Sequence, residues 1–229
     1  MPHDPVADRP PPPAGLPAEH WPRRTARLTG TFEKVWEQAL PHLDVRSNDV
    51  HSLYTFGLAS ALLDEVPQAR PDVVLPAALL HDTGWKAVPP DQILAAVADP
   101  VSNRETVRAH EREGARIAVR ILRDLGYPPE LTADVAAIVD GHDTRDHSLG
   151  PDDAVVRDAD KLWRLTPHGL RTIASWFGLD ATQALRLVSE RVDGQLFTSA
   201  ARAMAGALGA VATIDVSPQR LTLDRRGSG

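Results

Sequence analysis

At residues 73–85 the chain reads VVLPAALLHDTGW, an apolar run that ends in an adjacent histidine and aspartate. A helix that is apolar on every side is expected to lie in the protein core. An imidazole and a carboxylate at the end of such a helix cost free energy unless each has a partner. A metal ion is a partner for both, so His81 and Asp82 are candidate metal ligands. We expect Gly84 to end the helix in a left-handed cap.

Polar residues also interrupt apolar stripes in four other segments. These residues are His51, His110, His142 and Asp160. Each lies three, four or seven positions from apolar residues, which is the spacing of one helical face. A single histidine on an apolar stripe is most often a hydrogen-bonded core residue, but its recurrence in several segments favours a shared metal site. The histidines at positions 3, 20, 42 and 168 lack this setting.

Asp158 lies two residues before Asp160, so the two side chains point about 200° apart on a helix. Only one of them can face the metal easily, and Asp160 shares its face with Trp163. Two interpretations of Asp158 remain open. It either orients a ligand histidine or makes a buried hydrogen bond between helices.

The segments around these residues resemble the HD-domain superfamily of metal-dependent phosphohydrolases, in the family's order. They read HSL at 51–53, HDTGW at 81–85, HEREGA at 110–115, GHD at 141–143 and DADKL at 158–162. The resemblance implies an all-α helical bundle. It also implies a ligand set in which one metal is held by His51, His81, Asp82 and Asp160, and a second by His110 and His142, with Asp82 bridging.

The chain departs from the family's pattern at two positions. Many two-metal members carry a lysine directly after the glycine that follows His-Asp, whereas here Trp85 intervenes and Lys86 is the nearest basic residue. Some members have two adjacent histidines where this chain has His142 and Asp143. We expect Trp85 and Trp163, which flank the motifs, to form pocket walls.

Length and composition predict one soluble domain. The chain has 229 residues, which is enough for a substantial core. No apolar run approaches the ~20 residues that span a bilayer, and the proline-rich N-terminus lacks the apolar centre of a signal peptide. The absence of cysteine excludes thiolate metal sites and favours a cytoplasmic location. A net charge of -6 argues against nucleic-acid binding. The oligomeric state stays open.

We expect three regions along the chain: a disordered proline-rich arm at 1–25, an HD-domain helical bundle at 26–215, and a loose C-terminal tail at 216–229. Expected stops include Pro41, Gly126 and Gly178. A strand-like alternation occurs only at 212–216. Helices are expected at 26–40, 46–65, 71–82, 103–125, 128–142, 153–164, 168–177, 180–193 and 197–210.

Imidazole and carboxylate ligands without thiolate suit one or two ions of Mn, Fe, Co, Ni or Zn. Such an ion lowers the pKa of bound water toward ~7. Asp82 is the candidate to accept the proton and Lys86 to assist, while Lys86, Arg145 and His147 are candidates to hold a phosphate. The predicted function is hydrolysis of a phosphomonoester or phosphoanhydride in a small-molecule phosphorylated substrate, such as a nucleotide or related metabolite.

Two other function classes remain as alternatives. A few family members with six ligands are di-iron oxygenases that cleave a C–C or C–P bond, and the same donors serve both chemistries. The second alternative is a non-catalytic domain that senses a ligand or docks a partner. Such domains typically lose metal ligands, and none of the six is missing here. Arginines recur every four residues from Arg104 to Arg120. We interpret them as a solvated face paired with Glu105, Glu111, Glu113 and Asp124 rather than as a phosphate clamp.

Overall fold

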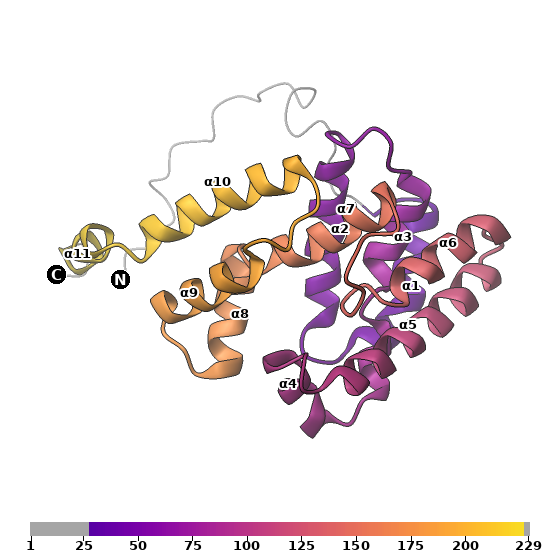
Figure 1. Cartoon of the computed structure of the whole chain (residues 1–229), viewed down its shortest axis with the longest axis horizontal. Helices are drawn as coiled ribbons and strands as arrows, with labels where there is room; N and C mark the ends of the chain where they lie inside the picture. The colour runs from indigo at the N-terminus through magenta and orange to yellow at the C-terminus, as the bar shows by residue number, and fades with distance from the viewer. Residues whose placement is uncertain (1–27, 227–229) are drawn as a thin grey trace, which may run out of the picture.

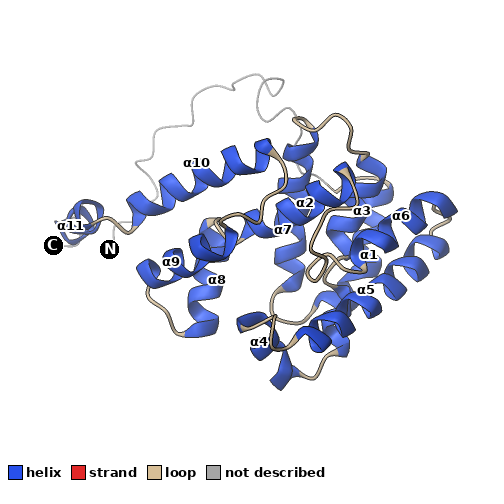
Figure 2. Ribbon diagram, in the orientation of Figure 1, coloured by secondary structure: helices blue, strands red, loops and turns tan. Residues whose placement is uncertain are grey.

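The computed structural model of the protein describes residues 28–226, and this part of the chain is helical without any strand (Figure 1, Figure 2). The predicted all-α fold is confirmed, while the predicted arm at 1–25 lies outside the described residues. None of the described helices is long and apolar enough to cross a membrane. The elements in chain order are α1 (Thr31–Leu43), α2 (Asn48–Leu63), α3 (Pro71–Leu80), the 3-10 helix η1 (Thr83–Ala87), α4 (Pro90–Ala98), α5 (Arg104–Asp124), α6 (Pro129–Val139), α7 (Pro151–Trp163), α8 (Pro167–Phe177), α9 (Ala181–Val192), α10 (Ser199–Asp215) and α11 (Pro218–Arg226).

Helix α3 is the centre of the main core. Every residue from Val73 to Leu80 is buried, and α3 packs against α1, α2, α5, α6 and α7. Pro71 occupies its first turn, where a missing N–H costs nothing. The apolar run therefore fills the interior and delivers His81 and Asp82, at its carboxyl end, among the surrounding helices.

Two smaller apolar clusters flank this core. One joins η1, α4 and α5 through Trp85, Ile93 and Val107. The other joins α7, α8 and α9 through Trp163 and Val188. Figure 1 shows α8 and α9 beside α7, on the opposite side of the molecule from α5 and α6. These clusters set the walls of the cavity described below.

The C-terminal region corrects the prediction of a loose tail from residue 216, since it is helical over Pro218–Arg226. The overlooked signal is Ser217 followed by Pro218: the Ser217 hydroxyl accepts a hydrogen bond from the backbone N–H of Arg220, and proline suits the first helical position. The strand-like residues 212–216 continue α10 to Asp215. Helix α4 was also not predicted, and α1 continues through Pro41 instead of stopping there.

Gly84 has a different role from the predicted left-handed cap. Its φ is not positive, and it lies inside η1. A Cβ atom at this position would overlap the carbonyl oxygen of His110 and the backbone nitrogen of Gly114. Gly84 is therefore required because η1 and α5 approach at backbone distance, which places His110 beside His81 and Asp82. Gly126 and Gly178, which were predicted as helix stops, do lie at helix ends and have positive φ.

Candidate metal centre

Five segments bring the six predicted ligands to one buried point. Helix α2 carries His51, the end of α3 carries His81 and Asp82, and α5 carries His110. His142 follows α6, and α7 carries Asp160. Each of the six residues is at most 6% exposed. The separate apolar stripes therefore do converge, as their spacing predicted.

The first group of ligand atoms surrounds His51 Nε2. This nitrogen is 3.0 Å from His81 Nε2, 3.3 Å from Asp160 Oδ1 and 3.4 Å from Asp82 Oδ2. Atoms that each lie 2.0–2.2 Å from one ion are about 3 to 3.5 Å apart. The spacing of this group is therefore that of ligands around a common ion.

The second group surrounds His110 and His142. Their Nε2 atoms are 3.9 and 3.7 Å from Asp82 Oδ1, and 3.7 and 3.6 Å from Asp143 Oδ2. Asp82 thus lies between the groups, with one oxygen toward His51 and the other toward His110 and His142. Asp143 was not predicted as a ligand, although its position next to His142 was a usable signal. Its side chain is 25% exposed and opens toward solvent.

Several imidazole nitrogens have no protein partner within the described structure. The Nδ1 atoms of His81 and His142 lie 2.9 Å from the carbonyl oxygens of Ala78 and Val139. Donation to these carbonyls orients both rings so that their Nε2 atoms face the centre. Nε2 of His142 and both ring nitrogens of His110 are buried and unbonded. Buried polar atoms are almost always paired, so this donor set fits a divalent metal.

The charge balance also fits metal binding. Burial would raise the pKa of Asp82, but His81, His142 and His51 hold it well below its usual value. Burial lowers the pKa of His110 to about 4. Burial alone would lower the pKa of His142, but the nearby Asp143 and Asp82 carboxylates raise it to about 10. Ionised carboxylates and a neutral His110 are ready to bind a cation, which would displace the proton on His142.

Two acidic residues near the centre hold its supporting segments. Asp158 accepts hydrogen bonds from the backbone N–H groups of Phe197 and Thr198 and from the Thr198 hydroxyl, so it anchors the start of α10 rather than a ligand histidine. Glu111 was predicted on the solvated face but is fully buried. It accepts from the N–H groups of Asp143 and Thr144 and so positions the segment that carries His142.

The prediction of a solvated arginine stripe on α5 holds for Arg112 and Arg116, whereas the side chain of Arg108 is only 27% exposed and pairs with the buried Glu111. Arg112 pairs with Glu105, and Arg116 pairs with Glu113, with exposed arginine side chains in both cases. Arg104 differs from them, because it lines the cavity next to the centre and donates to the Thr144 carbonyl oxygen.

The three basic residues predicted to hold phosphate have different positions. Lys86 binds the carbonyl oxygen of Pro41 and the carboxylate of Asp44, so its ammonium lies against α1 and outside the cavity. His147 is exposed and does not line the cavity either. The structure thus corrects both assignments. Arg145 does line the cavity, but its guanidinium is bound by Asp153 and by backbone carbonyl oxygens.

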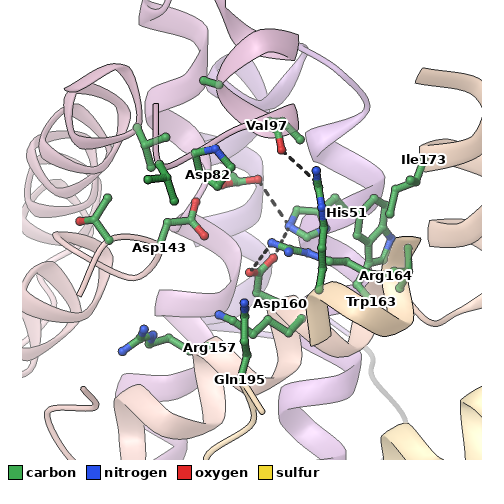
Figure 3. Close-up of a pocket in the computed structure, with 18 of the residues that line it drawn as sticks. His51, Asp82, Val97, Asp143, Arg157, Asp160, Trp163, Arg164, Ile173 and Gln195 are labelled. Carbon is green, nitrogen blue, oxygen red and sulfur yellow. Dashed lines mark hydrogen bonds and ion pairs between the residues drawn. The ribbon is translucent and has the colours of Figure 1, made fainter. Parts of the chain in front are cut away.

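A cavity of about 570 Å³ lies over the centre. Figure 3 shows His51, Asp82, Asp143 and Asp160 grouped at its wall, with Arg164 beside Asp160. Trp85 and Trp163 form part of the wall, as predicted. The aromatic lining is completed by Trp176, Phe177 and Phe197. The cationic lining consists of Arg46, Arg104, Arg145, Arg157, Lys161, Arg164 and Arg191. Most of these were missed, because they come from segments that meet only in the folded chain.

The helical fold and the buried histidine-aspartate cluster define an all-α domain with a candidate metal centre. A family model described as HD domain matches residues 48–165, which is just over half of the chain. The chain therefore belongs to the HD domain family, which confirms the resemblance noted in its sequence. No curated protein sequence matches the chain.

The fold is also similar to a crystal structure of a predicted HD superfamily hydrolase from an uncultured Thermotogales bacterium. The TM-score is 0.55 at 18% sequence identity, and the match covers 84% of this chain and 91% of that one. At this identity the likeness concerns the fold.

Proposed function

We propose that the protein hydrolyses a phosphomonoester or phosphoanhydride bond in a small molecule, with nucleotides and related metabolites as the substrate class. The observation that carries the proposal is the position of Asp82 between two groups of ligand atoms, at the wall of a cavity lined by cations. The cavity volume of about 570 Å³ is within the range of small-molecule sites. The structural relative's description as a predicted hydrolase agrees with this proposal.

The donor set suits two ions of Mn, Fe, Co, Ni or Zn. The first would be held by His51, His81, Asp82 and Asp160. The second would be held by His110, His142 and Asp143, with Asp82 shared. Ions at these positions would supply an activated water molecule and neutralise charge on the phosphoryl oxygens.

The chain's own residues would orient the substrate and handle the proton. Asp82 and Asp143 are carboxylates that face the centre, and their pKa values are both held below the usual value against the effect of burial. These low pKa values keep both carboxylates ionised, and an ionised carboxylate at either position would take the proton of the attacking water. Lys161 follows Asp160 in sequence, and Arg164 lies one helical turn further and pairs with Asp160. Both line the same cavity, where they would offset the negative charge of a phosphate.

A phosphate-release panel of nucleotides and sugar phosphates tests this function on the full chain loaded with Mn²⁺ or Fe²⁺. We expect turnover of at least one ester or anhydride, complete loss with chelator, and no dependence on O₂. Oxygen consumption is measured on the di-iron form in parallel. Turnover that stops without O₂, with no phosphate release, would favour an oxygenase. A metal-loaded protein that turns over nothing would favour a sensing or docking module.

Replacing His110 and His142 together with glutamine should lower the metal content from two ions per chain to one, because the second group then keeps only carboxylates. Elemental analysis after gel filtration measures the ratio. His147→Gln is the matched control, since this histidine is exposed and lies outside the cavity. A wild-type protein that never binds more than one ion at saturating Mn²⁺ contradicts the two-ion assignment.

A further inference from the structure

Arg46 lies in the turn between α1 and α2 in an unusual backbone conformation. Its φ is 54°, and the next residue, Ser47, has a φ of 61°. Residues other than glycine rarely adopt a positive φ, and such strain tends to cluster at ligand-binding sites. The turn therefore holds the Arg46 side chain in a position that costs local free energy.

The guanidinium of Arg46 lies between two indole rings. Its central carbon is 5.2 Å from the centre of the Trp85 ring and 4.7 Å from that of the Trp176 ring. Both rings and Arg46 line the cavity. These cation–π contacts orient the side chain, but they provide no hydrogen-bond acceptor and no negative charge.

Arg46 has unused hydrogen-bonding capacity. Its Nε and Nη1 atoms are buried and have no partner among the described residues. Nη2 makes one long bond of 3.4 Å to the Asn48 side chain. The other arginines that line the cavity have partners within the chain: Arg104 with the Thr144 carbonyl oxygen, Arg164 with Asp160, Arg145 and Arg157 with Asp153, and Arg191 with backbone carbonyl oxygens. A buried cation without a partner costs free energy, so we expect Arg46 to bind an anion from outside the chain.

Arg46 lies close to the metal centre, so an anion bound to it would lie near the candidate metal ligands. Trp85 Nε1 donates to Asp82 Oδ1 at 3.1 Å, and the Trp85 ring stacks on His110 with 3.8 Å between centroids. A single indole thus separates the guanidinium from two candidate ligands. Asn48, the first residue of α2, donates to the Asp82 carbonyl oxygen. The charges of Asp82, Asp143 and Asp160 reach Arg46 and partly offset the lowering of its pKa by burial.

We propose that Arg46 binds the substrate's phosphate group and thereby selects substrates that present a phosphate at the metal centre. Guanidinium groups form strong, charge-assisted hydrogen bonds with phosphate oxygens. The aromatic side chains of the cavity wall provide an apolar surface against which the organic part of such a substrate can pack. The inference rests on the proposed phosphohydrolase function and names the residue that provides affinity for the phosphate.

Calorimetric titration of the Mn²⁺-loaded full chain with inorganic phosphate tests the proposal. Arg46→Gln should weaken phosphate binding by about tenfold to a hundredfold, as expected for a lost hydrogen bond to a charged group. Arg186→Gln is the matched control, because the Arg186 side chain is 82% exposed on α9 and should leave affinity unchanged. Arg46→Met, which keeps an apolar stem on the two indoles, is the second variant should the glutamine variant fail to fold.

Metal content and helical circular dichroism identify the folded variants. In these, KM for the best substrate of the panel should rise by the same factor as the phosphate dissociation constant, with a smaller change in kcat. A purely structural role would not give this split. Unchanged phosphate affinity in a folded Arg46 variant overturns the proposal.

The two proposals fail in different ways. If the wild type hydrolyses phosphate esters but the folded Arg46 variants keep its KM, the role of Arg46 is wrong and the function stands. If phosphate binds in an Arg46-dependent way but no ester is hydrolysed, the anion site stands and the function is wrong. If metal-loaded wild type neither binds nor releases phosphate, both are wrong.

Discussion

Asp82→Ala should remove bound metal and activity together. The Asp82 carboxylate is within 3.9 Å of the Nε2 atoms of all four candidate ligand histidines, so both groups of candidate ligand atoms include it. Loss of a supporting group around a metal typically costs 10–100-fold in affinity, and loss of a shared ligand should exceed about 100-fold. Elemental analysis after gel filtration, together with phosphate release on the panel, measures both effects.

Asp124→Ala is the control for this experiment, because that carboxylate is 53% exposed at the end of α5. Its metal content and turnover should match the wild type. Asp82→Asn tests whether charge or shape matters, since the amide keeps one oxygen but loses the negative charge. An Asp82→Ala protein that retains stoichiometric metal at wild-type affinity would refute the ligand assignment.

Gly84→Ala should destabilise the fold and disturb the second group of ligands. The added methyl group would overlap the backbone of His110 and Gly114, and backbone atoms cannot rotate away as a side chain can. Helix α5 must then shift away from η1, which displaces His110 from Asp82. Overpacking of this kind costs about 1–3 kcal/mol or more. Denaturant unfolding measures the stability, and metal titration measures the second ion.

Gly206→Ala is the matched control. Gly206 lies within α10, and nothing lies within 4 Å of the Cβ that alanine would add. Alanine there should stabilise the protein by about 0.4–1 kcal/mol, because it restricts the unfolded chain. If Gly84→Ala unfolds at the same denaturant concentration as the wild type and binds the same metal, the close approach of η1 and α5 is not essential.

Periodicity made the helices and the inward direction of the ligands predictable. His51, His110 and Asp160 each share a face with apolar neighbours, and the apolar face of a helix must turn toward the core. The residues that share a helical face are close in sequence, so their direction can be predicted without knowing how the helices pack. The missed helix α11 was a local error of prediction. It begins at Pro218, in the region predicted as a tail, and the signal that was overlooked lies in the sequence at that point.

Proximity to a motif in the sequence did not predict which residues line the cavity. Lys86 follows the His-Asp pair closely, yet it binds Asp44 at the end of α1 and does not line the cavity. Arg46 is remote from that pair in sequence, yet it lies one indole away from it. The direction of a side chain beyond its own helix depends on which elements pack beside it, and no spacing rule carries that information.

The sequence by itself determined the helical class, the buried helix α3 and the inward direction of the six candidate ligands, because hydrophobic burial acts on patterns within single helices. Tertiary structure decided which other groups join them. Asp143 reaches the centre because Glu111 holds its backbone N–H. The cavity exists because α4, α8 and α9 pack on separate apolar clusters around it. Such contacts join residues far apart in the chain, so only the folded arrangement brings their charges and hydrogen bonds together.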